Sequence, residues 1–325
     1  MVMQGPGTKL ANVGRVMELP LPTCLHLEPV GRGQSSTRAP APALMSFDAY
    51  CRLLDEFPAA AQIEFSAPID PLLHPRFFDM VRYAGARGLQ VSARSDLVSL
   101  SPARAEECVK SGLFRLQVAL ESPRPRLANE VRVAAPFSRA LRNVTRLVET
   151  RRRLGSTAPQ IELLDIVTRS KLAQLPELVR SAQRHGAEAV CVLDIAESAR
   201  AQGLMRAFID TETLRGEDPA EIERVFAQTR AVAQSLGIGL RLPSLAPGEH
   251  CQRPWRSAYI GVAGQATPCS MAPGAFGNVL REGAARVWNA DAYREFRERL
   301  ASGNPPEPCK SCAFHRSNAA PFACD

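Results

Sequence analysis

Four cysteines near the end of the chain have the spacing of a metal or cluster site: Cys251, Cys269, Cys309 and Cys312. Cys309 and Cys312 form a Cys-x2-Cys pair, which lets two thiolates bind one metal or cluster from a tight turn. Cys251 and Cys269 lie at either end of a predicted β-hairpin, so four thiols converge if this hairpin folds onto the pair. Four thiolates fit a tetrahedral zinc ion and an iron–sulfur cube equally well, and spacing does not choose between them.

The remaining cysteines are expected to have no ligand role. The chain has nine cysteines, an odd number, and its start lacks the pattern of an export signal. A disulfide framework is therefore not expected, whereas reduced thiols or metal ligands are. Cys51, Cys108 and Cys191 fall within predicted helices or strands and are expected in the core. Cys324 is close enough to compete for the site, but a thiol beside the chain end is expected to be a bystander.

The elements before this segment predict an α/β fold. From residue 24 to residue 196, short aliphatic and β-branched runs alternate with helical patterns, which is typical of repeated βα units and a parallel sheet. Six strands are expected, at residues 24–28, 62–66, 89–93, 115–120, 160–167 and 189–195. Six such units close most of a barrel. The predicted fold class is therefore a partial (β/α)6 TIM-like barrel, followed by a small β-hairpin plus helix domain.

Helix boundaries are marked by capping residues. Ser46 is expected to cap the first helix, Pro75 to lie in the first turn of the second, and Ser101 with Pro102 to open the third. Gly88 and Gly112 mark the ends of two of these helices. Further helices are expected at residues 137–154, 173–185 and 219–236.

The Pro- and Gly-rich stretch 242–248 is the predicted domain boundary. Beyond it, strands at 255–262 and 265–269 form the hairpin, and 281–303 forms one or two short helices. The expected organisation is an N-terminal extension, a barrel and a small C-terminal domain, at residues 1–23, 24–240 and 249–325. The loop 29–45, built from Gly, Ser, Pro and Ala, is expected to be mobile.

The motifs between residues 251 and 312 are more specific than the spacing. They are Cys251-Gln-Arg-Pro-Trp255, Tyr259-Ile-Gly, Gly264-Gln-Ala-Thr-Pro-Cys269, Gly277-Asn278, Trp288-Asn289, Tyr293-Arg294 and Pro308-Cys309-Lys-Ser-Cys312. Together they closely resemble the SPASM or twitch domain of radical SAM enzymes. The resemblance implies one auxiliary 4Fe-4S cluster, held by Cys251, Cys269, Cys309 and Cys312.

The N-terminal portion also resembles the radical SAM fold. The segments that carry this likeness are Leu25-His-Leu-Glu28-Pro29, Met45-Ser-Phe-Asp-Ala-Tyr50, Asp70-Pro-Leu-Leu-His-Pro75-Arg-Phe and Leu175-Pro-Glu-Leu-Val179. In that family, a loop after the first strand carries Cys-x3-Cys-x2-Cys, which holds the catalytic cluster that binds S-adenosylmethionine. The flanking sequence puts the three positions at about Gly33, Thr37 and Pro40, and none of these residues can ligate iron.

A second departure concerns the glycine-rich turn that contacts the methionine end of S-adenosylmethionine in the family. Here it is Ala67-Pro68-Ile69-Asp70-Pro71, in which a β-branched side chain and a proline replace residues that let the backbone approach a ligand. Binding of S-adenosylmethionine is therefore not expected. The acidic residues retained in the barrel are expected to end strands and cap helices, namely Glu28, Asp70, Asp96 and Glu121.

Three hypotheses follow. The first is a non-catalytic homologue, a pseudoenzyme, in which the barrel serves as a partner or substrate-binding module and a partner protein supplies the activity. The second is an active radical SAM enzyme modifying a peptide or small metabolite, with Cys24, His26 or Cys51 as unusual ligands of the catalytic cluster. The third is a zinc-stabilised domain without a redox role.

Composition narrows the list of partners. The formal net charge is +7, but lysine occurs only four times and the arginines are scattered, which is typical of solvated helix surfaces. Nucleic acid is therefore not an expected partner. No segment approaches the roughly 18 apolar residues needed to span a bilayer, so the protein is expected to be cytoplasmic and not bound to a membrane.

Overall fold

The computed structural model describes residues 18–31, 42–66, 69–120, 134–195, 204–214, 217–243, 251–272, 274–310 and 312. Several predictions fall outside these ranges. They concern the missing cluster ligands at Gly33, Thr37 and Pro40, the turn residues Ala67 and Pro68, and the residues Glu121 and Cys324.

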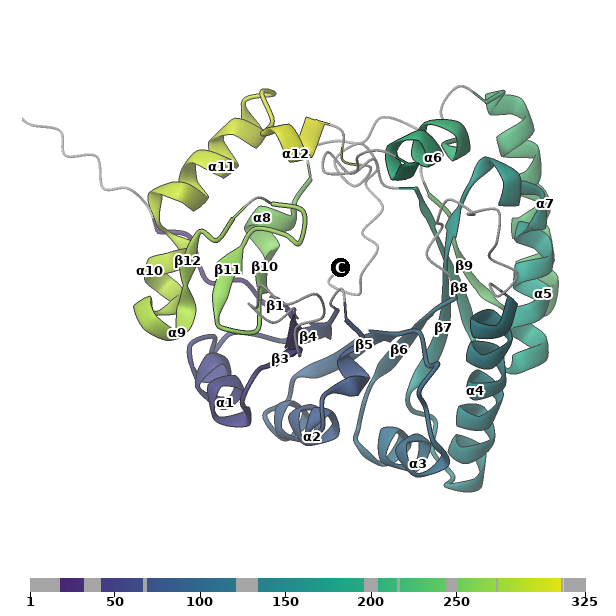
Figure 1. The fold of residues 1–325 in the computed structure, drawn as a ribbon, viewed down its shortest axis with the longest axis horizontal. Helices are drawn as coiled ribbons and strands as arrows, with labels where there is room; N and C mark the ends of the chain where they lie inside the picture. The colour runs from purple at the N-terminus through teal and green to yellow at the C-terminus, as the bar shows by residue number, and fades with distance from the viewer. Residues whose placement is uncertain are drawn as a thin grey trace, which may run out of the picture.

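A single curved sheet of ten strands organises the molecule (Figure 1), in the order β12-β11-β10-β1-β4-β5-β6-β7-β8-β9. The strands from β1 to β9 of this order pair in parallel. They are β1 Cys24–Leu27, β4 Gln62–Phe65, β5 Gln90–Ser95, β6 Arg115–Ala119, β7 Gln160–Val167, β8 Ala189–Asp194 and β9 Gly239–Arg241. The six predicted strands and the TIM-like α/β architecture are confirmed. Strand β9 was not predicted, because three residues beside Gly237 and Gly239 are too few to show a strand pattern.

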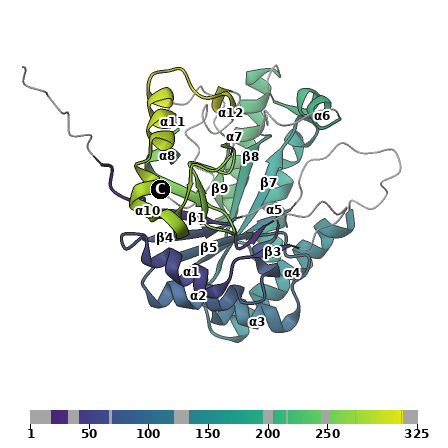
Figure 2. The same cartoon turned by 60° about the vertical axis from the view of Figure 1, so that its left-hand side comes forward.

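Helices cover the convex side of this sheet (Figures 1 and 2). The longer ones are α1 Phe47–Asp55, α2 Phe77–Ala86, α3 Pro102–Lys110, α4 Ala134–Arg153, α5 Leu175–His185 and α7 Pro219–Leu236. Helix α6 Leu204–Glu212 lies instead at the upper rim of the sheet in Figure 1, and η1 Pro71–Leu73 and η2 Arg169–Gln174 are 3₁₀ turns. Ser46 caps α1 and Ser101 caps α3, each by accepting a hydrogen bond from a backbone N–H three residues on. Gly88 and Gly112 have positive φ angles just beyond α2 and α3, as expected.

The start of α2 differs from the prediction. Pro75 lies two residues before the first helical residue, Phe77, rather than in the first turn. Asp70 accepts a hydrogen bond from the Leu72 N–H and starts η1 instead, and His74 after it remains extended. The 3₁₀ turn η1 therefore precedes α2 in the segment where the sequence predicts the start of a single helix.

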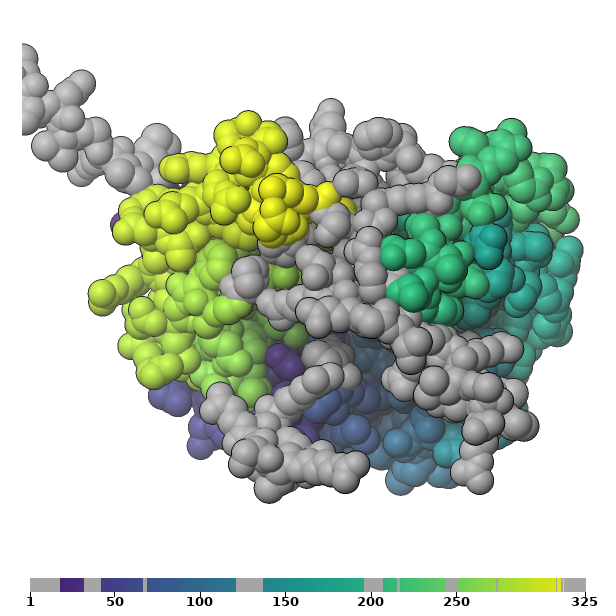
Figure 3. Space-filling view, turned by 45° about the horizontal axis from the view of Figure 1, so that its top comes forward, coloured from purple at the N-terminus to yellow at the C-terminus, as the bar shows by residue number. Residues whose placement is uncertain are grey.

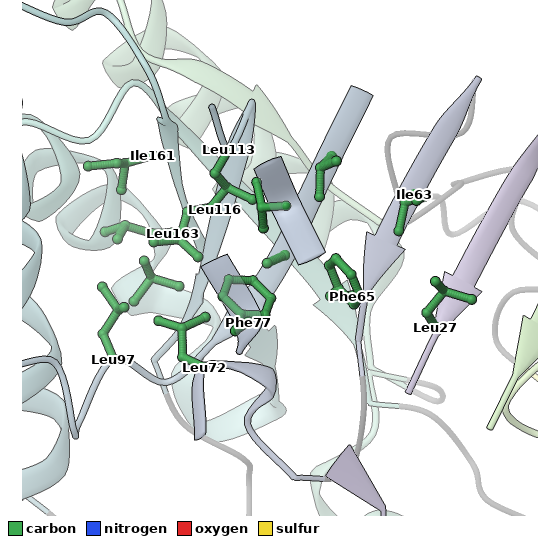
Figure 4. Packing of buried hydrophobic residues seen from close by; sticks show 14 of the residues in the cluster. Leu27, Ile63, Phe65, Leu72, Phe77, Leu97, Leu113, Leu116, Ile161 and Leu163 are labelled. Atoms are coloured by element: carbon green, nitrogen blue, oxygen red, sulfur yellow. The ribbon is translucent and has the colours of Figure 1, made fainter. Parts of the chain in front are cut away.

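Successive side chains along each strand lie on opposite faces of the sheet, one toward the helices and one toward the concave side. Leu27 in β1, Ile63 and Phe65 in β4, and Leu116 in β6 point toward the helices and are at most 1% exposed (Figure 4). They form the main hydrophobic core together with helix residues such as Phe77. Since successive side chains of a strand face opposite ways, the residues between them face the concave side of the sheet.

The C-terminal segment extends the same sheet. Strands β10 Ser257–Ile260, β11 Gln265–Thr267 and β12 Gly277–Asn278 pair antiparallel to one another, which confirms the predicted hairpin, although Trp255 and Arg256 belong to the short helix α8 Arg253–Arg256. β10 pairs in parallel with β1, with Ser257 opposite Cys24. The domain boundary at 242–248 stays a prediction, because residues 244–250 lie outside the described ranges.

The remaining helices of this segment lie on one side of the molecule, coloured yellow-green to yellow in Figure 3, opposite α6. They are α9 Val279–Glu282, α10 Ala284–Trp288, α11 Asp291–Ala301 and α12 Glu307–Lys310. One or two helices were expected at 281–303, whereas α9, α10 and α11 lie there, because Gly283 interrupts the first two with a positive φ angle. No helix in the described ranges combines the length and apolar character that crossing a membrane requires.

The loop after β1 is partly regular. Its two ends, β2 Val30–Gly31 and β3 Ala43–Leu44, pair as a small antiparallel ladder, and Val30 is 1% exposed. The expectation of a mobile loop over 29–45 is therefore wrong for these ends. Residues 32–41 between them lie outside the described ranges.

Candidate metal centre

The four predicted cysteine ligands lie in or beside three elements. Cys251 lies two residues before α8, Cys269 two residues after β11, Cys309 within α12 and Cys312 two residues after that helix. Cys309 is 8% exposed and belongs to a small apolar cluster with Ala272, Phe296 and Leu300, against which Trp255 and Cys269 pack. Local folding of α8, the hairpin, α11 and α12 therefore positions the thiols.

The four thiols lie within electrostatic reach of one another. Burial is the main cause that raises the pKa of Cys251, Cys269 and Cys309, the last to about 12. Cys269, Cys312 and Cys251 each raise the pKa of Cys309 further. Thiols in such surroundings resist ionisation, because thiolates would repel one another in a poorly hydrated place. A bound cationic metal or cluster removes this penalty.

Backbone N–H groups are directed at two of these sulfurs. The backbone N–H of Arg253 lowers the pKa of Cys251, and those of Met271 and Ala272 lower the pKa of Cys269, which in each case opposes the effect of burial. The Ala272 N–H also donates to the backbone carbonyl of Cys269 at 3.2 Å. The Arg253 guanidinium likewise lowers the pKa of both thiols. Hydrogen bonds of this kind favour the thiolate, the form that ligates metal, and orient it.

The donor set suits an iron–sulfur cluster, whose irons take thiolate ligands. In the described part of the chain, none of the four cysteines forms a disulfide. Over the same residues, no three His, Cys, Asp or Glu side chains are arranged to hold a single metal ion. The ligand assignment therefore rests on the mutual electrostatic contact of the thiols and stays a proposal.

Arg297 connects the helices around the site and was not singled out from the sequence. It is 4% exposed, and its Nε donates to the carbonyl of Pro254 at 2.8 Å while its Nη1 donates to that of Trp288 at 2.9 Å. The guanidinium also lies 4.1 Å from the centre of the Trp288 ring. α11 is thereby attached to α8, which follows Cys251. Arg297 lies four residues after Tyr293 and three before Leu300, so its position on the apolar face of α11 was the signal in the sequence that could have identified it.

The Gly277-Asn278 motif has a structural explanation. Asn278 caps α9 through its side-chain oxygen, and its Nδ2 donates to the carbonyl of Ala263 in the hairpin turn at 2.8 Å. A Cβ on Gly277 would lie 2.9 Å from a methyl group of Val287, and its φ angle is +156°. Gly277 therefore permits close packing, and Asn278 joins the turn of the hairpin to the next helix.

The acidic residues at the carboxyl ends of the strands make contacts within the chain. Asp70 accepts hydrogen bonds from the Leu72 N–H at 2.8 Å and from the Ser95 hydroxyl at 2.6 Å, and burial raises its pKa to about 6. Asp96 accepts from the Val98 N–H at 2.8 Å. These two residues have the capping and strand-end contacts that the sequence predicts.

The alternative ligands Cys24, His26 and Cys51 do not form one group. Cys24 Sγ and His26 Nε2 are 4.0 Å apart in β1, and burial lowers the pKa of His26 to about 3. Cys51 belongs to α1, in the helical layer beyond the convex side of the sheet. Cys108 and Cys191 are fully buried, as predicted.

Comparison with known proteins begins with this segment. A family model for the SPASM domain, described as an iron-sulfur cluster-binding domain, matches residues 251–313 and so includes all four cysteines. The chain is 23% identical over 276 residues to the tungsten-containing aldehyde ferredoxin oxidoreductase cofactor-modifying protein of Pyrococcus furiosus, a match that covers 78% of this chain and 75% of the relative. It is 24% identical over 263 residues to the mycofactocin maturase MftC of Mycobacterium ulcerans, covering 76% and 66%.

Solved structures share the fold. SuiB from Streptococcus suis superposes with a TM-score of 0.60 over 91% of this chain and 71% of SuiB, at 13% identity, in a crystal structure bound to its precursor peptide SuiA. Another SuiB structure is bound to S-adenosylmethionine. At this identity the likeness shows the fold alone. The SPASM match, the two relatives and the shared architecture together support the resemblance to radical SAM proteins with a C-terminal SPASM domain.

Proposed function

We propose that this chain is a non-catalytic member of its family, which holds one auxiliary 4Fe-4S cluster and uses its barrel to bind a peptide. The observation that carries the proposal is the contrast between the two halves. The four cysteines of the C-terminal segment are present and act electrostatically on one another, whereas the sequence has no cysteine between Cys24 and Cys51, where the family places its catalytic ligands.

The cluster would be held by Cys251, Cys269, Cys309 and Cys312. When bound, it supplies a redox centre and a cross-link between segments that have few apolar contacts of their own. The described residues prepare for it in two ways. The N–H groups of Arg253, Met271 and Ala272 favour ionised sulfur, and Arg297 keeps α8 and α11 together.

The barrel supports a non-catalytic role. At the turn after β4, both carboxylate oxygens of Asp70 accept hydrogen bonds from the chain itself, so this turn is committed to starting η1. Ile69 adds a β-branched side chain where the family has a residue that lets the backbone approach a ligand. We therefore expect S-adenosylmethionine to bind weakly or not at all.

A peptide is the ligand class that the relatives favour. SuiB is described in complex with a precursor peptide, and MftC is named a maturase. A family member without a catalytic cluster would contribute peptide binding, while a partner protein supplies the chemistry.

The second candidate is an active radical SAM enzyme with unusual ligands for its catalytic cluster. It is favoured by the names of the curated relatives, a cofactor-modifying protein and a maturase. The positions of Cys24, His26 and Cys51 weigh against it, because the sheet separates Cys51 from the other two.

Anaerobic purification with iron and sulfide quantification, followed by a reductive S-adenosylmethionine cleavage assay, tests these alternatives. About four irons per chain without formation of 5′-deoxyadenosine supports the proposal. About eight irons with formation of 5′-deoxyadenosine would establish the active enzyme. A colourless protein that contains zinc would establish the zinc-stabilised domain.

Cys309→Ser identifies the ligands in the same preparation. We expect it to lose most of its iron and to melt at a lower temperature, because cluster binding stabilises the folded segment. Cys191→Ser is the matched control, since Cys191 is fully buried in β8, and it should keep full iron content. A Cys309→Ser protein with full iron and unchanged melting would show that the four-thiolate assignment is wrong.

A further inference from the structure

The concave side of the sheet carries a group of polar side chains that the proposed cluster does not use. Glu64 lies between Ile63 and Phe65, which face the helices, so its side chain faces the concave side. Gln117 in β6 and Glu162 in β7 are register partners and also face this side. Glu64, Gln117 and Glu162 are 4%, 3% and 8% exposed. We call these three residues the inner polar group.

Only part of this group has partners. Glu162 accepts a hydrogen bond from Gln117 Nε2 at 2.6 Å and another from Arg241 Nη2 at 3.1 Å. Both oxygens of Glu64 and the Oε1 of Gln117 are buried and accept no hydrogen bond from the residues that the structure describes. Nδ1 of His26 lies 3.7 Å from Oε2 of Glu64, which is too far for a hydrogen bond, and burial lowers the pKa of His26 to about 3, so this imidazole is neutral at ordinary pH.

Three unsatisfied acceptors inside one protein require an explanation. Burying a carboxylate or an amide oxygen without a donor is costly, and native structures contain few such atoms. A core that needed only stability would have an apolar residue at position 64, like its neighbours in β4. The acceptors are therefore placed for a ligand that brings N–H or O–H donors.

The charges around Glu64 restrict this ligand further. Three arginines lower the pKa of Glu64, and Glu162 in β7 raises it. The charges of all four side chains therefore act at Glu64; the arginines are Arg94 in β5, Arg241 in β9 and Arg253 in α8. Three arginines and one glutamate thus lie around Glu64, so cations outnumber anions by one when Glu64 itself is counted as charged. A ligand that suits this space therefore has a negative charge, which the arginines attract, and N–H donors, which the acceptors bind. An acidic residue within a peptide has both features.

We propose that the inner polar group binds an acidic residue of a peptide, with the backbone N–H groups of the peptide donating to Glu64 and Gln117 and its carboxylate lying toward the arginines. This inference rests on the proposed peptide-binding role and specifies the side chain that the barrel selects. The three residues of the inner polar group take no part in cluster binding, whereas Arg253 acts on both Glu64 and the proposed cysteine ligands.

Two pools of N-acetylated, C-amidated pentapeptides provide the probe. The pools have the same random flanking residues and differ only in a central Glu or Gln. Equilibrium dialysis against the cluster-containing protein, quantified by mass spectrometry, measures the retained fraction of each pool. We expect the Glu pool to be retained at least threefold better, and Arg94→Gln to remove this preference.

Glu64→Leu separates a ligand role from a structural one. We expect this variant to keep its iron, to melt at a higher temperature without peptide because an unsatisfied carboxyl is gone, and to lose at least tenfold in affinity for the Glu pool. Glu107→Leu is the matched control, because Glu107 is exposed on α3, and it should change neither retention nor iron content.

The possible failures are distinguishable. Equal retention of both pools, with no effect of Glu64→Leu on affinity, would refute the acidic selectivity and leave the peptide-binding role intact. A lower melting temperature for Glu64→Leu with unchanged affinity would assign the group to ordered water and structure only. If neither pool is retained while iron remains at about four per chain, the peptide role itself fails together with this inference.

Discussion

Buried residues with unusual surroundings give the sharpest predictions about single side chains. Tyr293 is fully buried in α11, and its hydroxyl has no hydrogen-bond partner among the described residues. Burial raises its pKa well above the ordinary value. Its ring nevertheless packs edge-on against Phe276 at 5.3 Å. The ring therefore stabilises the segment around the site, whereas the hydroxyl opposes this effect.

We expect Tyr293→Phe to increase the free energy of unfolding by about 1 kcal/mol, because the ring contacts remain and an unsatisfied buried hydroxyl is removed. Urea denaturation of both proteins, with cluster content matched, measures the difference. Destabilisation by a similar amount would show that the hydroxyl bonds to a buried water molecule.

Glu64 gives a prediction about pH. Burial raises its pKa from 4.5 to about 7, so its contribution to stability is fully present below pH 4.5 and is lost as the pH rises through 7. The neutral variant Glu64→Gln does not undergo this loss. From pH 5 to pH 8, we expect the variant to gain up to about 3 kcal/mol relative to the wild type.

Comparison of the two proteins at each pH isolates this effect. His26, whose pKa is lowered to about 3 by burial, has the opposite trend, since its contribution is present above pH 6.5 and lost as the pH falls. Both proteins contain His26. A difference between their unfolding free energies that does not vary with pH would show that Glu64 keeps an ordinary pKa.

At the scale of elements, the C-terminal helices depend on polar connections as well as on apolar packing. Arg297 joins α11 to the carbonyls of Pro254 and Trp288, and Trp288 Nε1 donates to the carbonyl of Pro20 at 2.9 Å. Asn278 joins α9 to the hairpin turn. These bonds connect short helices, each of which has too few residues to be stable alone.

Arg297→Lys tests this arrangement. Lysine keeps the charge but cannot reach two carbonyls with a planar fork, so we expect a loss of at least about 2 kcal/mol in unfolding free energy and a lower iron content. Thermal melting and iron quantification measure the two effects. Arg299→Lys, at an exposed position of the same helix, is the control and should match the wild type. Equal behaviour of the two variants would contradict a positioning role for Arg297.

At the scale of the whole molecule, the hairpin belongs to the barrel sheet. β10 pairs with β1 over four residues, whereas β11 and β12 depend on β10 and on the segment around the cysteines. Loss of the cluster should therefore affect the C-terminal segment unevenly, since β10 keeps a partner that does not depend on iron.

Hydrogen exchange measured by mass spectrometry on protein with and without its iron tests this expectation. Without iron, we expect faster exchange in α12 and around β11 and β12, while β10 and the strands β4 to β8 keep their protection. Uniform acceleration across the barrel would mean that the cluster stabilises the whole molecule rather than its C-terminal segment.

The sequence alone determined the βα architecture and the four candidate ligands. Strands such as Gln160–Val167 and helices such as Pro219–Leu236 have local patterns and caps, and local signals of this kind survive without knowledge of the fold. The cysteines were found because a Cys-x2-Cys pair in loop sequence is rarely a core feature. Strand β9 and the ladder of β2 with β3 were missed, because two or three residues carry no pattern.

Only the tertiary structure decided which residues share a space. Pairing of β10 with β1, the position of Arg297 between two carbonyls, and the convergence of Glu64, Gln117 and Glu162 all join residues far apart in the chain. The physical reason is that a strand pattern gives the face of each side chain, whereas curvature and strand order decide what that face meets across the sheet.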